Sequence, residues 1–222
     1  MTRLSSVAGA LALVTSFVAS GCLVSNLPGS ARPAGAGVTE LDVVNQIAVT
    51  LEDDAEKADL TAIGGSLFGL GIGDLGFIHG ISDRVDVGVR GGISGTLGGS
   101  LKGLLVHTGP LWVAAFGEGR FYYLAPELRL AHAGLIATLG NGPVAFSFGG
   151  FAGNMWGKTK ETDTEPARTV DGPYVGGGLG FEAQSSMFVH QAMFELQRYT
   201  IDDFKAYTAM VTLHTKFGAR ER

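Results

Sequence analysis

Residues 85–94 read VDVGVRGGIS. In an extended chain the odd positions of this stretch, which are valine or isoleucine apart from one glycine, fall on one face. The even positions, among them Asp86 and Arg90, fall on the opposite face. Alternation over this length predicts a β-strand with one apolar and one polar face.

The same period of two recurs through most of the chain. Near the C-terminus, for example, Val211 and Leu213 alternate with Thr212 and His214. We expect ten strands, with eight as the alternative count. They are predicted at residues 40–50, 62–80, 84–96, 99–107, 111–121, 127–139, 143–157, 172–184, 187–199 and 204–217.

These strands predict an all-β fold, a closed antiparallel up-and-down transmembrane β-barrel. In hydrocarbon every backbone N–H and C=O needs a partner within the protein, so strands cross a bilayer only as a closed sheet. About ten strands enclose a lumen little wider than side chains can fill. We therefore expect a hydrogen-bonded interior rather than a porin-sized channel.

Two sets of side chains follow from this geometry. The polar residues expected to face the lumen are Asp86, Arg90, Glu182, Gln191, Glu195, Gln197 and Lys216. Charges in such a lumen have to be paired, because an unpaired buried charge is costly. The aromatic residues expected to form girdles at the two membrane interfaces are Trp112, Tyr122, Tyr123, Trp156, Tyr174 and Tyr199. The alternative role for these aromatics is to fill the core of a soluble barrel.

The connections between strands differ in length. Those after even-numbered strands are tight, such as Ser82-Asp83-Arg84 and Asn141-Gly142-Pro143. The longest polar connections, at residues 52–57 and 158–166, follow odd-numbered strands. Short periplasmic turns and longer external loops are typical of outer-membrane barrels. Odd strands are therefore expected to run outward.

The first residues have the pattern of an export signal. One positive charge precedes a short apolar run and then Ala19-Ser20-Gly21-Cys22, which holds the only cysteine. This end resembles the lipobox of bacterial lipoproteins. The resemblance implies that residues 1–21 are a signal peptide and that Cys22 is the lipidation site, acylated for example with palmitate. It also implies recognition by the lipoprotein-sorting machinery. The ordinary alternative is a signal cut nearby with a spare thiol.

Residues 22–38 are rich in proline, glycine and alanine, which predicts a lipidated flexible tether. The barrel domain is then expected at residues 39–217, with a tail at 218–222. Residues 81–90 and the terminal alternation ending at Phe217 resemble the tight turn and the C-terminal assembly signal of bacterial outer-membrane β-barrel proteins. The resemblance implies the outer membrane as location and its lipids and assembly machinery as partners.

Composition excludes several classes of function. The formal net charge of −5 gives no electrostatic basis for binding nucleic acid. A single cysteine excludes a disulfide framework within the chain and any site built on several cysteines. The residues give no indication of oligomeric state.

Motifs that resemble catalytic or binding sites are weak here. Residues 71–76 match the spacing GxGxxG, but no helix pattern follows, so we expect no dinucleotide site. The five histidines have no metal-ligand spacing, and the acidic run 52–56 is read as a solvated loop rather than a cation site. We expect no catalytic site, no metal and no cofactor.

Three functional hypotheses remain. The first is a lipid-anchored outer-membrane barrel with a structural or surface-interaction role. The second is a periplasmic lipocalin-like barrel that holds an apolar ligand. The third, a barrel enzyme acting on lipids, would use His190 near Ser185 and Ser186, or His214 beside Thr215, although neither pair is well placed.

Overall fold

The computed structural model describes residues 26–52, 61–63, 73–92, 95–123, 128–158, 169–185, 188–201 and 204–218. These residues form eleven strands. The strands are β1 (Thr39–Glu52), β2 (Thr61–Ile63), β3 (Asp74–Gly80), β4 (Val85–Gly92), β5 (Thr96–Thr108), β6 (Leu111–Tyr122), β7 (Arg129–Leu139), β8 (Val144–Lys158), β9 (Thr169–Gln184), β10 (Phe188–Ile201) and β11 (Phe204–Phe217). No helix within the described ranges is long and apolar enough to cross a membrane.

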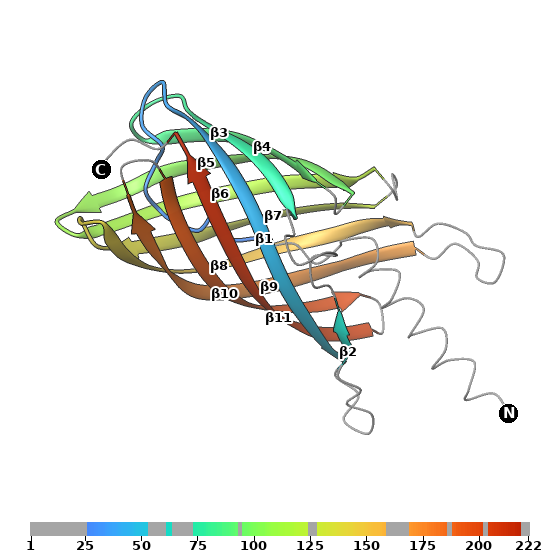
Figure 1. The fold of residues 1–222 in the computed structure, drawn as a ribbon. Helices are drawn as coiled ribbons and strands as arrows, with labels where there is room; N and C mark the ends of the chain where they lie inside the picture. Colours follow the sequence, from blue (N-terminus) through green and yellow to red (C-terminus); the bar gives the residue numbers. More distant parts are fainter. Residues whose placement is uncertain are drawn as a thin grey trace, which may run out of the picture.

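The strands close into one antiparallel barrel (Figure 1). Neighbours in sequence pair from β3 to β11, and β1 completes the ring by pairing with β11 from Leu41↔Phe217 to Glu52↔Ala206. On its other side β1 pairs with β3 over residues 39–44 and with β2 over residues 48–50. Because β2 and β3 share one place in the ring, the barrel has ten strand positions, as predicted.

The predicted strands are confirmed, with one difference. Within the expected strand at residues 62–80 the structure describes β2 and β3, and residues 64–72 between them lie outside the described part of the chain.

The two rims of the barrel are distinct. We call the rim with residues 81–84, 109–110, 140–143 and 185–187 the turn end, and β1 begins and β11 ends there. We call the opposite rim the loop end. It has the connections on either side of β2 and those at residues 93–95, 123–128, 159–168 and 202–203. The predicted difference in loop length therefore separates the two rims, although two connections at the loop end are also short.

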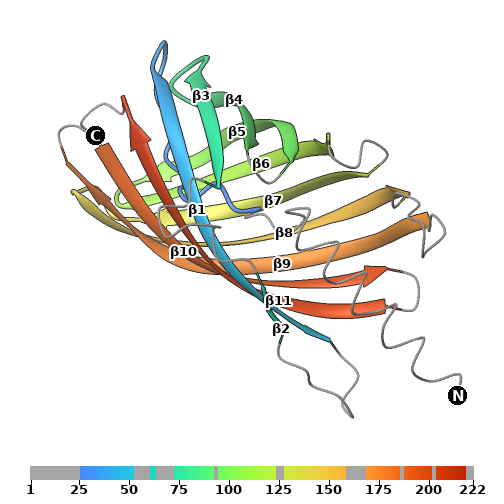
Figure 2. The ribbon, with the colours of Figure 1, turned by 45° about the vertical axis from the view of Figure 1, so that its right-hand side comes forward.

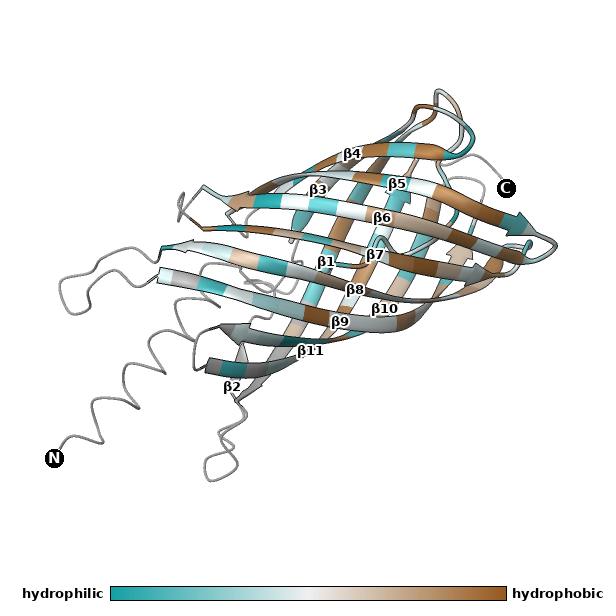
Figure 3. Ribbon diagram, turned by 180° about the vertical axis from the view of Figure 1, so that it is seen from behind, coloured by the Kyte–Doolittle hydropathy of each residue, from teal (hydrophilic) through white to brown (hydrophobic). Residues whose placement is uncertain are grey.

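The outside of the barrel is apolar and the inside is polar. Along β9, for instance, Val175, Leu179 and Phe181 face outward, and each exposes about half of its surface. Glu182, on the alternate face, is buried. Figure 3 shows the same alternation of hydrophobic and hydrophilic positions along β4. This arrangement satisfies the bilayer outside and buries polar groups where they can pair.

The aromatic girdle is confirmed only in part. Tyr123 and Trp156 are exposed, but Tyr122, Tyr174 and Tyr199 are buried inside the barrel. They belong to an apolar cluster in the lumen that also contains Phe116 and Phe151. The three tyrosines lie near strand ends as expected, yet they share the inward face of their strands with charged or amide residues.

A charge on the outer face is expected to destabilise the barrel in proportion to its depth. Leu135 exposes 55% of its surface near the middle of β7. We expect Leu135→Arg to reduce the free energy of unfolding by about 2–4 kcal/mol, because it places a cation in hydrocarbon. The matched control is Ile81→Arg at the turn end, where the expected loss is about 0–1 kcal/mol. Denaturant titrations in lipid vesicles would measure both losses, and equal losses would contradict a membrane-facing exterior.

Candidate functional site

The lumen is lined by the polar side chains that the sequence places there. Of the seven predicted residues, all are buried except Arg90, whose side chain keeps 13% of its accessible surface. They pair with one another as well as with other residues. Gln191 donates to Glu182 (2.7 Å) and Gln197 donates to Glu195 (3.2 Å). The prediction of a hydrogen-bonded interior is therefore confirmed.

Residues 26–34, which precede β1, lie inside this lumen (Figures 1 and 2). Leu27, Ser30 and Arg32 each expose 2% or less of their surface. We call residues 26–34 the plug. The prediction that residues 22–38 form a free tether is thus wrong for the plug, because its backbone and side chains find partners on the barrel wall. Residues 22–25, including Cys22, lie outside the described part of the chain.

Arg32 is the main electrostatic contact of the plug. Its guanidinium lies 3.0 Å from the Glu182 carboxylate on β9, and both side chains are buried. The same group donates to the backbone carbonyls of Gly140 and Gly142 in the turn between β7 and β8. Arginine suits this position because its planar head satisfies a carboxylate and two carbonyls together.

A second ionic contact lies on the opposite wall. Lys102 on β5 donates to the backbone carbonyls of Ser30 (3.3 Å) and Arg32 (2.7 Å). Its ammonium is also 3.1 Å from the carboxylate of Asp86 on β4. Asp86 in turn accepts from the backbone N–H of Ala34 at 3.0 Å. The wall therefore recognises the main chain of the plug at both its donors and its acceptors.

The first described residue is held deeper in the barrel. The Asn26 N–H donates to Glu195 on β10 (3.1 Å), and the Asn26 carbonyl accepts from Nε2 of His132 on β7 (3.1 Å). With its proton on Nε2, the imidazole accepts at Nδ1 from the Tyr174 hydroxyl (3.0 Å). Further along the plug, the Ala31 N–H donates to the Thr138 hydroxyl (2.8 Å). The plug thus bridges strands from both sides of the ring.

Two glycines make space for the plug. At Gly29, where φ is +78°, an added Cβ would collide with the amide of Gln191. At Gly178, on the inner face of β9, an added Cβ would lie 3.0 Å from Leu27 and closer still to the Phe194 carbonyl. Leu27 packs in the apolar cluster of the lumen because position 178 has no side chain.

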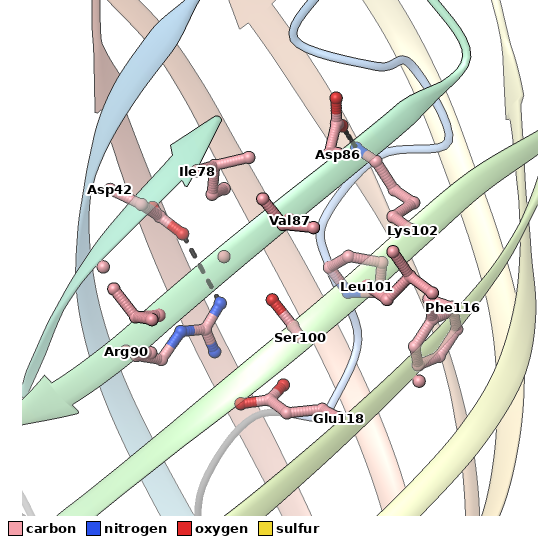
Figure 4. Close-up of a pocket in the computed structure, with 15 residues that line it drawn as sticks. Asp42, Ile78, Asp86, Val87, Arg90, Ser100, Leu101, Lys102, Phe116 and Glu118 are labelled. Atoms are coloured by element: carbon pink, nitrogen blue, oxygen red, sulfur yellow. Dashed lines mark hydrogen bonds and ion pairs between the residues drawn. The ribbon is translucent and has the colours of Figure 1, made fainter. Parts of the chain in front are cut away.

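A small cavity remains between the plug and strands β1 and β3 to β6. Its volume is about 40 Å³, and Pro28 lines it together with Ser100 and Phe116 (Figure 4). At one side of the cavity, the Asp42 carboxylate lies 3.5 Å from the Arg90 guanidinium and 3.1 Å from Nδ1 of His214. The cavity has room for a few water molecules. It is far smaller than the roughly 300 Å³ at which small-molecule pockets begin.

The structure separates the proposed catalytic groups. His190 is exposed and its Nδ1 lies 3.1 Å from the Thr215 hydroxyl, whereas Ser185 bonds to the backbone of Phe188 at the turn end. Ser186 lies outside the described residues. His214 is buried against Asp42, on the face opposite Thr215. These positions bring neither histidine to a described serine.

The two weak binding motifs also have a structural context. Of the GxGxxG stretch, residues 71–72 lie outside the described part, and Asp74 to Gly76 belong to β3 and pair with β1. A strand at this point does not provide the helix N-terminus that a phosphate loop needs. The acidic residues Asp53, Asp54 and Glu56 lie outside the described residues.

Sequence reasoning missed the plug, although one signal was present. The predicted lumen contains three acids, Asp86, Glu182 and Glu195, against the two cations Arg90 and Lys216. Charges in a lumen must be paired. Arg32 is the one charged residue between Cys22 and Val38 and supplies the missing positive charge. The imbalance could therefore have placed this segment inside.

Comparisons with known proteins concern the fold. No protein-family model matches the chain, and no curated protein matches it. Among solved structures, Neisserial surface protein A has a TM-score of 0.41 and 11% identity over 81% of this chain and 96% of its own. Ail of Yersinia pestis has a TM-score of 0.38 and 16% identity, over 82% of this chain and 99% of its own. The outer membrane protein OprG of Pseudomonas aeruginosa has a TM-score of 0.35 and 11% identity, over 84% of this chain and 100% of its own. At these identities the likeness assigns no ligand and no activity.

Proposed function

We propose that this chain is a lipid-anchored outer-membrane β-barrel with a structural or surface-interaction role and no catalytic activity. The observation that carries the proposal is the polarity of the closed sheet. Outward positions such as Leu101, Leu179 and Leu196 expose about half of their apolar surface, while charged residues are paired inside. A closed sheet with this polarity matches the requirements of a bilayer.

The plug supports a role that does not depend on transport. Its residues are buried in the interior, and the described cavity of about 40 Å³ beside it is too small for an organic solute. What the barrel then offers to other molecules is its rims. The loop end includes the ten-residue connection 159–168, and five of these ten residues are charged.

The alternative of a lipocalin-like barrel needs the reverse polarity. A soluble barrel packs apolar residues inside and exposes polar ones. Here the exposed residues on β10 and β11 include Phe194, Leu196, Val211 and Leu213, and the buried ones include Glu195 and Lys216.

For the enzyme alternative, loss of esterase activity in detergent on changing His190→Ala or His214→Ala would favour catalysis over the proposal.

Protease treatment of intact cells tests the orientation of the barrel. We expect trypsin to cleave after Lys158 or Lys160, because the connection at residues 159–168 belongs to the loop end, and the longer connections of such barrels are external. Arg84, exposed at the turn end, should be cleaved only after the outer membrane is permeabilised. Immunoblots of the fragments would measure both events.

The control variant changes Lys158, Lys160 and Arg168 to glutamine, which removes the trypsin sites of this connection. In cells with this variant, the fragments produced by cleavage after residues 158, 160 and 168 should disappear, while any cleavage after Lys57 at the same rim should remain. Protection of the native loop together with cleavage at Arg84 in intact cells would reverse the orientation. Cleavage at neither site before permeabilisation would contradict a surface role.

A further inference from the structure

Cations on the outer face of the barrel gather toward the loop end. The exposed basic side chains on the described strands are Arg129 on β7, Lys158 on β8, Arg198 on β10 and Lys205 on β11. Each lies at even spacing from outward apolar residues of its own strand, as Arg129 does from Leu135. Of the other described lysines and arginines, Arg84 lies in a turn and five are inside the barrel. We call the four exposed cations the basic belt.

The strand register places the basic belt on one side of the barrel, among aromatic rings. Strands β7 to β11 are consecutive in the ring. Arg129 is directly opposite Trp156, and the Arg198 guanidinium lies 5.6 Å from the centre of the Tyr207 ring. Both rings expose about 40% of their surface. On the neighbouring strands β5 and β6, the outward residues at the same end include the uncharged pair Leu97 and Phe121.

The two arginines lie one apolar band away from the turn end. Arg129 is ten residues from Leu139, where β7 ends, and Arg198 is ten residues from Phe188, where β10 begins. With about 3.3 Å per residue and a tilt of about 40°, both separations are roughly 25 Å along the barrel axis. The apolar band of outer-membrane barrels is about 25 Å tall. The arginines therefore lie at the level where hydrocarbon ends and lipid headgroups begin.

The local charge at this level is positive although the chain as a whole is acidic. The formal net charge of the chain is −5. On β7 to β11 the exposed acid among the described side chains is Asp171, which accepts from the Asn154 amide at 3.0 Å. Asp202 and Asp203, between β10 and β11, lie outside the described residues. Four cations on the strands thus face the membrane interface with one described acid beside them.

We propose that the basic belt binds the phosphate groups of anionic lipids in the leaflet at the loop end. This inference rests on the proposed membrane location of the barrel. The arginine head matches the geometry of a phosphate with two parallel N–H donors, and each basic residue near a membrane surface attracts anionic lipid. A lipid is the partner that fits, because the belt stands on an apolar wall where headgroups are the adjacent polar layer. A soluble acidic partner would have to displace those headgroups first.

The test uses Trp156 as a reporter within the belt. The chain has two tryptophans, so Trp112→Phe leaves Trp156 as the single fluorophore. The full chain with this change is folded into vesicles of phosphatidylcholine that contain either brominated phosphatidic acid or brominated phosphatidylcholine as quencher. Since one basic residue contributes about a fivefold preference for anionic lipid, we expect phosphatidic acid to occupy the Trp156 site at least about fivefold more tightly. Equal quenching by the two lipids would overturn the proposal.

Two variants assign the preference to the belt. Arg129→Gln combined with Lys158→Gln removes the cations opposite Trp156 and two residues beyond it, and should bring the preference close to one. The matched control, Arg84→Gln, removes an exposed cation at the turn end and should leave the preference at Trp156 unchanged. A preference that survives the double change, or that the control abolishes, would contradict a role for the belt.

The same measurements separate the possible failures. Quenching by neither lipid in a folded chain, shown by heat-modifiable migration, would contradict the membrane location itself. Quenching by both lipids without preference would leave that location intact and remove only the lipid site. If the double variant does not fold, a salt titration of the Trp112→Phe chain replaces it. The preference should fall between about 0.1 M and 1 M salt, where the screening length shrinks from about 10 Å to about 3 Å. A preference independent of salt would overturn the proposal.

Discussion

Replacing Glu182 with alanine is expected to reduce the free energy of unfolding by about 3–5 kcal/mol, because it leaves a buried cation without its carboxylate. The Arg32 guanidinium would keep the carbonyls of Gly140 and Gly142 but lose its ion pair. Gln191, which donates to Glu182, would also lose an acceptor. Denaturant titration in lipid vesicles, followed by tryptophan fluorescence, would measure the loss.

A double-mutant cycle separates the ion pair from the cavity that alanine leaves. Arg32→Met removes the buried charge, so Glu182→Ala should be much less harmful in the Arg32→Met protein than in the native one. The coupling energy should exceed about 1 kcal/mol, as is usual for contacting residues in one network. Additive losses would mean that Arg32 and Glu182 do not contact each other in the folded barrel.

Deleting residues 26–34 is expected to open the barrel to small ions. The deletion empties the space between Lys102 on one wall and Glu182 and Glu195 on the other. It also removes one positive charge and leaves these two acids facing the lumen, which favours cation selectivity. In planar bilayers the native barrel should stay closed. The deletion variant should conduct, far below the level of porins with 16–18 strands.

The control for this experiment is Asp83→Ala. It removes the contact with Ala36 at the exposed rim but leaves the plug contacts with Lys102 and Glu182 intact. This variant should remain closed. A deletion variant that folds, shown by heat-modifiable migration, and still conducts nothing would assign the seal to the aromatic residues of the wall. The plug would then have no role in closing the lumen.

The strands were predictable because their signal is local. A period of two along residues 85–94 fixes both the strand and its two faces, and the structure places Asp86 inside as expected. The same period of two also predicts the inward position of the tyrosines that we expected in the membrane-interface girdles. Tyr174 lies at even spacing from Glu182, and Tyr199 at even spacing from Gln197, so the period places them inside. Their position near strand ends was the weaker signal.

The plug was not predictable from periodicity. Residues 26–38 have no repeating pattern, and proline and glycine within them favour irregular backbone. Their partners are distant in the chain, since Asn26 and Glu195 are separated by 169 residues. Only the excess of acidic residues in the predicted lumen pointed to Arg32, because a buried charged side chain needs a partner of opposite charge in any backbone conformation.

The pairing of β1 with β11 bears on how the cylinder assembles. The plug is joined to β1, the strand whose ladder with β11 shuts the ring, and its partners belong to β4, β5, β7, β9 and β10. Such remote pairings form slowly, because loop-closure entropy is lost before any contact compensates for it. If residues 26–34 already contact the forming sheet, the strands can curve around them. The β1–β11 ladder would then close the barrel around an interior that is already occupied.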